Sequence, residues 1–294
     1  MSEATAFMGF SRSELDREYS PSSLVPDFPA CLNEYARRSA DARDQHRPLI
    51  SLAYGPAPEA RLDLFPVSGR EAPLQVFVHG GYWQEVTKEE SSFAATGFLA
   101  SDIAFAALDY GLAPAYHLDE IVTMVHEAVV WLHENAPRFG IDPRRIHLSG
   151  SSAGAHLVAM ALVRDDTHRI AGATLLSGVY DLEPLRHTYV NGPLALDRGA
   201  ALRNSPLYHL PARLPPVVIA RGGRETGEFI RQHDTMTALL RPRAPVTEIV
   251  CPARDHFDLP YDLGEPHTAL GRAVLAQIQA PDAATTRKGQ RAHE

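Results

Sequence analysis

The sequence predicts an α/β fold built around a mostly parallel central sheet flanked by helices, and three observations lead to it. Nearly continuous apolar runs at 74–80 and 103–111 are typical of strands that are covered on both faces. Such runs alternate along the chain with segments of helical spacing, for example 119–140, and this alternation is typical of parallel sheets. The chain has 294 residues, 45% of them hydrophobic, which is enough for one large buried core.

Each strand is predicted from a β-rich apolar run, and each helix from apolar residues three and four positions apart. The predicted strands, in chain order, are 49–55, 61–67, 74–80, 103–111, 145–150, 170–178, 215–223 and 245–252. The predicted helices, in chain order, are 32–43, 119–140, 153–166, 226–240 and 266–280.

The chain divides into an arm, one α/β domain and a tail. Residues 1–48 are polar and contain a stretch rich in turn formers, and we expect them to pack as an arm on the domain that follows. The domain spans 49–280, and the irregular stretch 182–213 interrupts its alternation of strands and helices as a small cap-like insertion. The polar C-terminal tail, 281–294, is expected to be mobile.

The composition excludes several classes of protein. The net charge is −8 and no block of Lys and Arg precedes the short C-terminal tail, so no nucleic-acid partner is expected. Neither a signal peptide nor an apolar run of ~18 residues is present, so we expect no membrane partner and a cytoplasmic protein. Cys31 and Cys251 have no metal-type spacing, and the chain contains no HExxH, paired CxxC or Walker-type loop. We therefore expect no metal and no organic cofactor.

Two neighbouring serines, Ser151 and Ser152, lie in the run LSGSSAGAH between a predicted strand and a predicted helix. A serine at a sharp strand-to-helix turn has a strained backbone, and the turn tolerates only very small residues two positions before and after it. This is the G-x-S-x-G pattern of a nucleophile elbow. Gly150 and Gly154 occupy those positions around Ser152, so Ser152 is the candidate nucleophile. A serine that only caps the helix is the alternative interpretation.

A second motif, HGGYW at 79–83, directly follows the apolar run QVFV. An acyl-transfer site needs N–H donors aimed at the oxyanion, and backbone amides approach closely only where side chains are absent. Gly80 and Gly81 are therefore predicted oxyanion donors, together with the N–H of Ala153 at the start of the helix after the serine. His79 is expected to brace the loop. A Gly-Gly turn beside a buried aromatic pair is the alternative interpretation.

An acid and a base are expected after the serine, in the order Ser, Asp or Glu, His. After the strand 215–223, Glu225 lies in the turn and Glu228 within the next helix. Glu225 is therefore the predicted acid, and Glu228 is the alternative. His256 lies in the loop after the last strand and is the predicted base, with His267 as the alternative.

Three aromatic residues are predicted to face an aromatic leaving group in the substrate pocket. Tyr82 and Trp83 complete the HGGYW motif, and Tyr110 lies near the end of the predicted strand 103–111. Core packing would explain each of these aromatic residues equally well.

With these residues placed, the chain resembles the kynurenine formamidases (arylformamidases), a branch of the α/β-hydrolase superfamily with esterase relatives. The resemblance rests on REYSPSS, HGGYW, GSSAGAH, ETGEFIRQ and DHFDL, which follow one another in the expected order over most of the chain. It implies an α/β-hydrolase fold, with Ser152 as nucleophile, His256 as base and an acid at the position of Glu225. Better-known members have Asp at that position, where this sequence has Glu. A glutamate can fill the role of the acid in the triad, but because of this difference the resemblance implies the chemistry more firmly than the substrate.

The motifs and the resemblance together predict a serine hydrolase that cleaves an N-formyl aryl amine, for example N-formylkynurenine, through an acyl-enzyme on Ser152. A short-chain or aryl carboxylesterase with the same triad is the first alternative. A non-catalytic ligand receptor on a hydrolase scaffold is the second, although such proteins often lose a triad member and this chain has all three. The expected partner is a small-molecule substrate, and a homodimer is left open.

Overall fold

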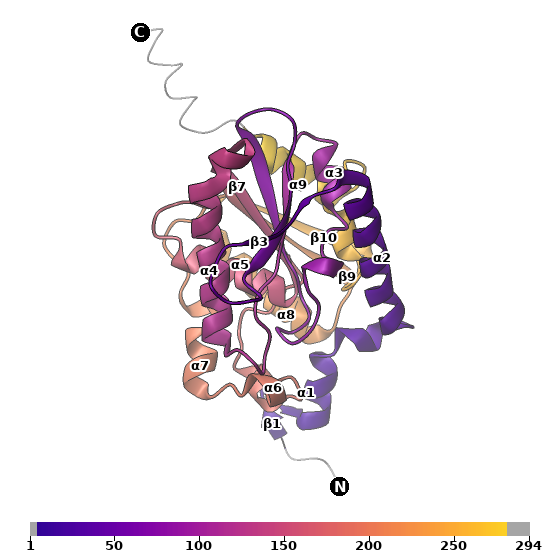
Figure 1. Cartoon of the computed structure of the whole chain (residues 1–294). Coiled ribbons are helices and arrows are strands. Elements are labelled where there is room, and N and C mark those ends of the chain that lie inside the picture. Colours follow the sequence, from indigo (N-terminus) through magenta and orange to yellow (C-terminus); the bar gives the residue numbers. More distant parts are fainter. Residues whose placement is uncertain (1–4, 281–294) are drawn as a thin grey trace, which may run out of the picture.

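Eight strands form one sheet at the centre of the structure, a computed structural model that describes residues 5–280 (Figure 1). In spatial order they are β10 (Val246–Asp255), β9 (Val217–Arg224), β8 (Gly172–Leu176), β7 (Ile141–Ser151), β5 (Ala72–Val78), β6 (Ala104–Leu108), β4 (Arg61–Phe65) and β3 (Leu49–Ala53). Neighbours from β10 to β6 run parallel, whereas β4 and β3 are added antiparallel at one edge. The mostly parallel sheet predicted from the sequence is confirmed.

Helices cover both faces of the sheet. One face packs against α4 (Leu118–Asn135), α5 (Ala153–Arg164) and α8 (Gly227–Leu240), and the other against α2 (Phe28–His46), α3 (Ala95–Leu99) and α9 (Ala269–Gln279). Successive strand side chains point to opposite faces, so in β5 Val76 and Val78 join the first core and Phe77 joins the second. Because both faces are buried, the central strands are apolar at nearly every position, and this made them recognisable in the sequence.

The segment before the sheet is more helical than the sequence predicts. It contains a small hairpin of β1 (Thr5–Phe7) and β2 (Phe10–Ser11), then α1 (Arg12–Glu18), the 3₁₀ helix η1 (Pro21–Leu24) and α2. Only a helix over 32–43 was predicted here. α2 begins earlier, at Phe28, because the Asp27 side chain accepts a hydrogen bond from the Ala30 N–H at 3.0 Å and Pro29 stands in the first turn.

The irregular stretch 182–213 folds as four short helices between β8 and β9. They are η4 (Pro184–His187), α6 (Asn191–Leu194), α7 (Arg198–Arg203) and η5 (Pro206–Tyr208). The Phe7 ring stacks on His187 at a centroid distance of 5.1 Å, and the Tyr189 N–H donates to the Asp16 carboxylate at 2.7 Å. The insertion therefore contacts the N-terminal arm at the end of the molecule where α1 and α6 lie in Figure 1.

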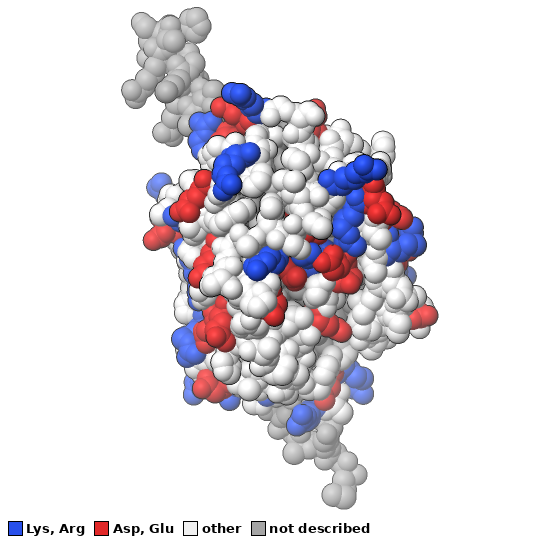
Figure 2. Space-filling view, viewed as in Figure 1, with Lys and Arg blue, Asp and Glu red and all other residues white. Residues whose placement is uncertain are grey.

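In the described part of the chain, no helix is both long and apolar enough to cross a bilayer. On the face drawn in Figure 2, acidic and basic side chains lie interspersed instead of gathering by sign. The predicted tail, 281–294, lies outside the described residues, as do residues 1–4.

Candidate active site

The turn from β7 into α5 has the geometry of a nucleophile elbow. Ser152 has φ 56° and ψ −118°, in the left-handed region that L-residues avoid, and its N–H donates to the Leu176 carbonyl at 2.8 Å. A Cβ on Gly150 would lie 2.3 Å from the Gly154 carbonyl carbon, and one on Gly154 would lie 2.0 Å from the Val78 carbonyl oxygen. Both positions thus exclude any side chain, which is the requirement that led from the sequence to Ser152.

The HGGYW loop after β5 lies directly against this elbow. A Cβ on Gly80 would lie 3.3 Å from the Ser152 Cβ, so the backbone of Gly80 approaches the serine closely. Gly81 has φ 90°, and a Cβ there would stand 2.1 Å from the Glu85 carbonyl oxygen, so only glycine fits. Within residues 5–280 the N–H groups of Gly80 and Gly81 donate to no other protein atom. The N–H of Ala153 belongs to the first turn of α5, where amides have no intrahelical acceptor.

Two rings hold the loop from the side of the core. The His79 ring stacks on the Tyr110 ring at a centroid distance of 4.1 Å, and the Tyr110 hydroxyl donates to the His79 carbonyl at 2.8 Å. The His79 Nε2 lies 3.4 Å from the Asp109 carboxylate. Burial raises the pKa of Tyr110 well above its ordinary value, so its hydroxyl keeps the proton that it donates.

Glu225 and His256 meet at the ends of neighbouring parallel strands. Glu225 follows β9 and His256 follows β10, and the Nδ1 of His256 lies 3.0 Å from the Oε2 of Glu225. The other carboxylate oxygen of Glu225 accepts a hydrogen bond from the Ser177 hydroxyl at 2.5 Å. The Glu225 side chain is fully buried, and the Phe229 ring packs edge-on against His256 at 4.7 Å. This pair is therefore shielded from water, which strengthens its electrostatic interaction.

The alternative residues named from the sequence have other environments. Glu228 is buried, but it accepts a hydrogen bond from the Tyr19 hydroxyl at 2.8 Å and pairs with Arg231 at 2.8 Å. His267 is exposed and does not line the cavity described next. Of the predicted residues, the structure thus brings Glu225 and His256 into contact.

A cavity of about 470 Å³ opens over the elbow, and Ser152, His256, Gly80 and Gly81 all line it. Within the described residues no hydrogen bond joins Ser152 to His256. Both side chains line the cavity, and a hydrogen bond between two such groups often forms only when a ligand binds.

Most of the remaining cavity wall comes from segments to which the sequence assigned no site residue. α2 contributes Phe28, Leu32 and Tyr35, and the insertion contributes Tyr189 and Val190. The α2 residues are spaced i, i+4 and i+7, a helical stripe that is visible in the sequence, but the spacing alone does not say what the stripe faces.

Two of the three aromatic residues predicted for the pocket lie elsewhere, and that expectation is corrected. Tyr82 lines the cavity, and its hydroxyl donates to the Tyr19 carbonyl at 2.7 Å. Trp83 is fully buried and packs edge-on against His156 at 4.9 Å, because positive φ at both loop residues turns Trp83 into the core. Tyr110 is buried under the loop and contacts its carbonyls.

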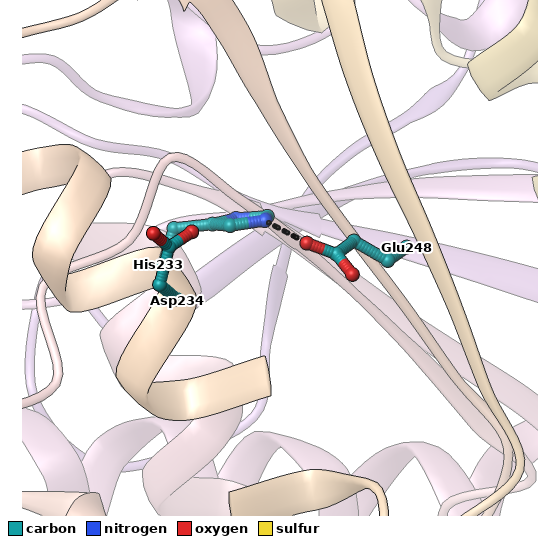
Figure 3. A group of neighbouring side chains, drawn as sticks. All are labelled: His233, Asp234 and Glu248. Carbon is teal, nitrogen blue, oxygen red and sulfur yellow. Dashed lines mark hydrogen bonds and ion pairs between the residues drawn. The ribbon is translucent and has the colours of Figure 1, made fainter. Parts of the chain in front are cut away.

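One group of side chains in the described part has the composition of a metal site. Figure 3 shows the His233 ring of α8 pointing toward Glu248 of β10, at 3.3 Å, with Asp234 beside it. The Arg241 guanidinium donates to the second Glu248 oxygen at 2.6 Å, and Asp234 and Glu248 are exposed. These contacts are those of an ion-pair network at the surface, and we assign no metal to the group.

Comparison with known proteins places the chain among hydrolases. Residues 62–179 match the family model described as BD-FAE. Kynurenine formamidase of Salmo salar is 32% identical over 271 residues, which cover 84% of this chain and 90% of the relative. Kynurenine formamidase of Danio rerio is 32% identical over 287 residues, covering 91% and 97%. An isoprenylcysteine α-carbonyl methylesterase of Arabidopsis thaliana is 29% identical over 71% of this chain and 56% of the relative.

Solved structures have the same fold. A protein of Silicibacter sp. TM1040 that is assigned as a thioesterase superposes with a TM-score of 0.80 at 29% identity, covering 91% of this chain and 99% of that one. An esterase from Pyrobaculum calidifontis superposes with a TM-score of 0.67 at 17% identity, covering 92% and 96%. The α/β-hydrolase fold implied by the sequence motifs is thereby confirmed.

Proposed function

The chain belongs to the kynurenine formamidase family of α/β-hydrolases, and we propose that it is a serine hydrolase of N-formyl aryl amines, for example N-formylkynurenine. The proposal rests mainly on the buried hydrogen bond between His256 and Glu225. His256 and Ser152 line the same cavity. The family membership makes the chain a hydrolase. The residue roles below are part of the proposal.

Ser152 acts as the nucleophile in this proposal. Its Oγ attacks the formyl carbon while the Nε2 of His256 takes the hydroxyl proton, since the Nδ1 of the same ring is bonded to Glu225. Glu225 holds the ring in the tautomer whose Nε2 can accept a proton, and its charge stabilises the imidazolium that forms. The buried Ser177 hydroxyl keeps the carboxylate in place.

The negative charge that develops on the formyl oxygen is stabilised by backbone amides. Gly80 and Gly81 offer N–H groups that have no acceptor among residues 5–280, and Ala153 offers one at the positive end of the α5 dipole. Loss of a single donor of this kind typically costs roughly 2.7–4 kcal/mol of transition-state stabilisation.

The intermediate then collapses to products in two stages. The C–N bond breaks, His256 returns its proton to the departing aryl amine, and the formyl group remains as an ester on Ser152. A water molecule gives a proton to His256 and attacks the ester carbon, which releases formate and restores the serine hydroxyl. Neither stage requires a metal or an organic cofactor, and the substrate is the only partner in the proposal.

The cavity wall supports an aromatic leaving group. Tyr82 borders the loop that carries the oxyanion donors, and Phe28, Tyr35 and Phe93 add further rings to the lining. Aromatic rings pack favourably in offset or edge-on arrangements, beyond the gain from burying their area. Trp83 and Tyr110 act only by supporting the loop.

A carboxylesterase acting on short-chain or aryl esters is the second candidate function. It is favoured by the methylesterase among the relatives, and it would use the same three residues. A non-catalytic receptor on a hydrolase scaffold is less well supported, because Ser, Glu and His positions are all filled.

The test is a rate series with N-formylkynurenine and p-nitrophenyl acetate for the wild type, Ser152→Ala and the neighbouring control Ser151→Ala. We expect the wild type and the control to cleave the formamide with kcat/KM of at least ~10⁴ M⁻¹s⁻¹, a usual enzymatic value. Ser152→Ala should abolish the reaction. Cleavage of the ester alone, still through Ser152, would favour the esterase, and full activity in Ser152→Ala would refute the assigned nucleophile.

A further inference from the structure

Two of the sequence motifs on which the resemblance to the kynurenine formamidases rests contact each other in the structure. REYSPSS, at 17–23, belongs to the N-terminal arm, and ETGEFIRQ, at 225–232, carries the proposed acid and the first turns of α8. The Thr226 hydroxyl donates to the Glu18 carbonyl at 2.5 Å, although 208 positions separate the two residues. The proposed mechanism uses Glu225 of the second motif and no residue of the first.

The helix that follows the proposed acid is capped by a residue of the arm. Thr226 is the N-cap residue of α8, and a threonine at this position usually accepts a hydrogen bond from an N–H of the first turn. The Thr226 side chain accepts no such bond, and its hydroxyl donates to the Glu18 carbonyl. Instead, the Glu18 carboxylate accepts the hydrogen bond from the Glu228 N–H, at 2.9 Å. Glu18 therefore acts as the N-terminal cap of α8 from outside the helix.

Charge and space both favour a carboxylate at this place. The amides of the first turn form the positive end of the α8 dipole, so a negative charge beside them is stabilised. Gly227 is the first residue of α8, and a Cβ on it would lie 3.0 Å from the Glu18 Oε2. The absence of a side chain at this position leaves room for Glu18 to reach the Glu228 N–H.

The capped turn is the one that carries Glu225. Glu225 directly precedes Thr226, between the end of β9 and the start of α8, so its backbone lies one residue from the contact with Glu18. Its carboxylate lies 3.0 Å from the Nδ1 of His256, and a hydrogen bond of this length is lost when the atoms separate by about half an ångström more. A small movement of the turn would therefore break the pair of acid and base.

The next residue of the arm holds α8 at a different place. The Tyr19 hydroxyl donates to the Glu228 carboxylate at 2.8 Å and accepts a hydrogen bond from the Gln232 amide at 3.1 Å. Both partners are side chains of α8 itself, beyond the turn that carries the acid. Of the two arm residues, Glu18 is thus the one that bonds to Thr226, next to Glu225.

We propose that Glu18 positions Glu225 by capping α8, so that the N-terminal arm helps to assemble the acid–base pair. This inference rests on the proposed function, because it requires that Glu225 acts as the acid. Glu18 is absent from the described residues that line the cavity, so it is a positioning residue and not a catalytic one. Its loss should lower kcat, which depends on the bond between Glu225 and His256, and leave KM nearly unchanged.

The experiment measures kcat, KM and urea unfolding of the wild type and three variants, with N-formylkynurenine and p-nitrophenyl acetate as substrates. Glu18→Ala removes the acceptor of the Glu228 N–H, whereas Glu18→Gln keeps a carbonyl oxygen in its place. Tyr19→Phe is the control, because it removes a hydrogen bond between the same arm segment and α8 away from the acid. Glu18→Ala is also combined with Glu225→Gln.

Glu18→Ala should lower kcat by ~10- to 100-fold, since a displacement of about 1 Å can slow a reaction ~100-fold, and KM should stay within about 3-fold. Glu18→Gln should return kcat to within about 5-fold of the wild type, because the charge of a helix cap contributes little beyond its hydrogen bond. Tyr19→Phe should lose a similar amount of stability but keep kcat within about 2-fold. In the Glu225→Gln protein, Glu18→Ala should lower kcat by less than about 2-fold, because residues that act as a unit are not additive.

Two outcomes would overturn the inference. One is a Glu18→Ala protein with the kcat of the wild type, and the other is an equal effect of Glu18→Ala with and without Glu225→Gln. Failure of the proposed function gives a different result, since Glu225→Gln alone would then keep its activity. If only the ester is cleaved but the effects of Glu18→Ala and Glu225→Gln are not additive, the formamidase proposal fails and the positioning by Glu18 stands.

Discussion

Replacement of Glu225 by glutamine should abolish most of the activity while the protein stays folded. The substitution keeps the shape of the side chain and removes its charge. The carbonyl oxygen of the new amide still accepts the Ser177 hydroxyl, but its NH₂ group faces the Nδ1 of His256, where the carboxylate stood at 3.0 Å. The ring must then place its proton on Nε2, and a protonated Nε2 cannot accept the proton of Ser152.

The size of this effect follows from the burial of the pair. The Glu225 side chain is fully buried and the His256 side chain is only 4% exposed, so water cannot replace the lost charge beside the imidazolium. Loss of the acid in a triad of this kind lowers kcat by about 10⁴, which corresponds to ~5 kcal/mol at 1.36 kcal/mol for each tenfold change. The free energy of unfolding should change by much less, within roughly 1–3 kcal/mol, because the hydrogen bond from the Ser177 hydroxyl to the side chain at position 225 is kept.

The assay compares kcat for wild type, Glu225→Gln and Glu228→Gln, with urea unfolding of all three. Glu228→Gln removes the same charge three residues later, where the carboxylate pairs with Tyr19 and Arg231 instead of His256. We expect it to cost stability and leave kcat within about tenfold, since the acid–base pair is untouched. A Glu225→Gln protein with more than a tenth of wild-type kcat, or a larger loss in Glu228→Gln, would refute the assignment of the acid.

Three further predictions concern the fold that holds the site. Gly154→Ala should cost more than ~4 kcal/mol or prevent folding, whereas Gly192→Ala, where a Cβ meets nothing within 4 Å, should be nearly neutral in urea unfolding. Tyr19→Phe should lower the free energy of unfolding by about 1–3 kcal/mol, because it leaves a buried carboxylate one hydrogen bond short, with little change in kcat/KM. Burial lowers the pKa of His147 and of His156 to about 4 each, so the folded protein binds fewer protons than the unfolded chain below pH 6.5. Stability should therefore be complete above pH 6.5 and fall toward pH 4, by about 3 kcal/mol at pH 5.5 for the two histidines together.

Each of these predictions has an outcome that contradicts it. A Cβ at position 154 would lie 2.0 Å from the Val78 carbonyl oxygen. A folded and active Gly154→Ala protein would therefore show that the backbone around the elbow can move enough to accept a side chain. A Tyr19→Phe protein as stable as wild type would mean that the bond to Glu228 adds nothing to stability. Unfolding free energies that stay level from pH 6.5 to pH 4.5 would show that His147 and His156 are not buried in their neutral forms.

The residues of the candidate site that could be predicted from sequence are those whose position depends on their immediate neighbours in the chain. Ser152 was predicted as the nucleophile because a strained turn needs Gly150 and Gly154, and both glycines lie two residues from it in the sequence. Glu225 and His256 were predicted from the order serine, acid, histidine and from their places directly after two strands. The structure shows that those strands, β9 and β10, are parallel neighbours, so the residues that follow them meet.

The cavity walls could not be predicted in the same way. Phe28, Leu32 and Tyr35 form a stripe on α2, but the stripe alone gives no sign that it faces Ser152. That placement depends on how the arm packs across the ends of the strands. The contact between the arm and the insertion joins residues more than a hundred positions apart, such as Asp16 and Tyr189.

Aromatic residues next to the motif were the least predictable. Tyr82 and Trp83 are neighbours in the sequence, yet one lines the cavity and the other lies in the core. Their directions are set by positive φ angles of 49° and 60°, which the residue types do not indicate. α2 is longer than predicted although its start was encoded by Asp27 and Pro29, so cap signals would have placed that end correctly.

The measurement that tests the assigned nucleophile most directly is covalent labelling with a fluorophosphonate, which modifies serine hydroxyls activated by a base. The wild-type protein is labelled, digested and mapped by mass spectrometry, beside Ser152→Ala and His256→Ala. The account predicts one modified serine, Ser152, in the wild type and no rapid labelling in either variant. Labelling on Ser151, or equally fast labelling without His256, would contradict it.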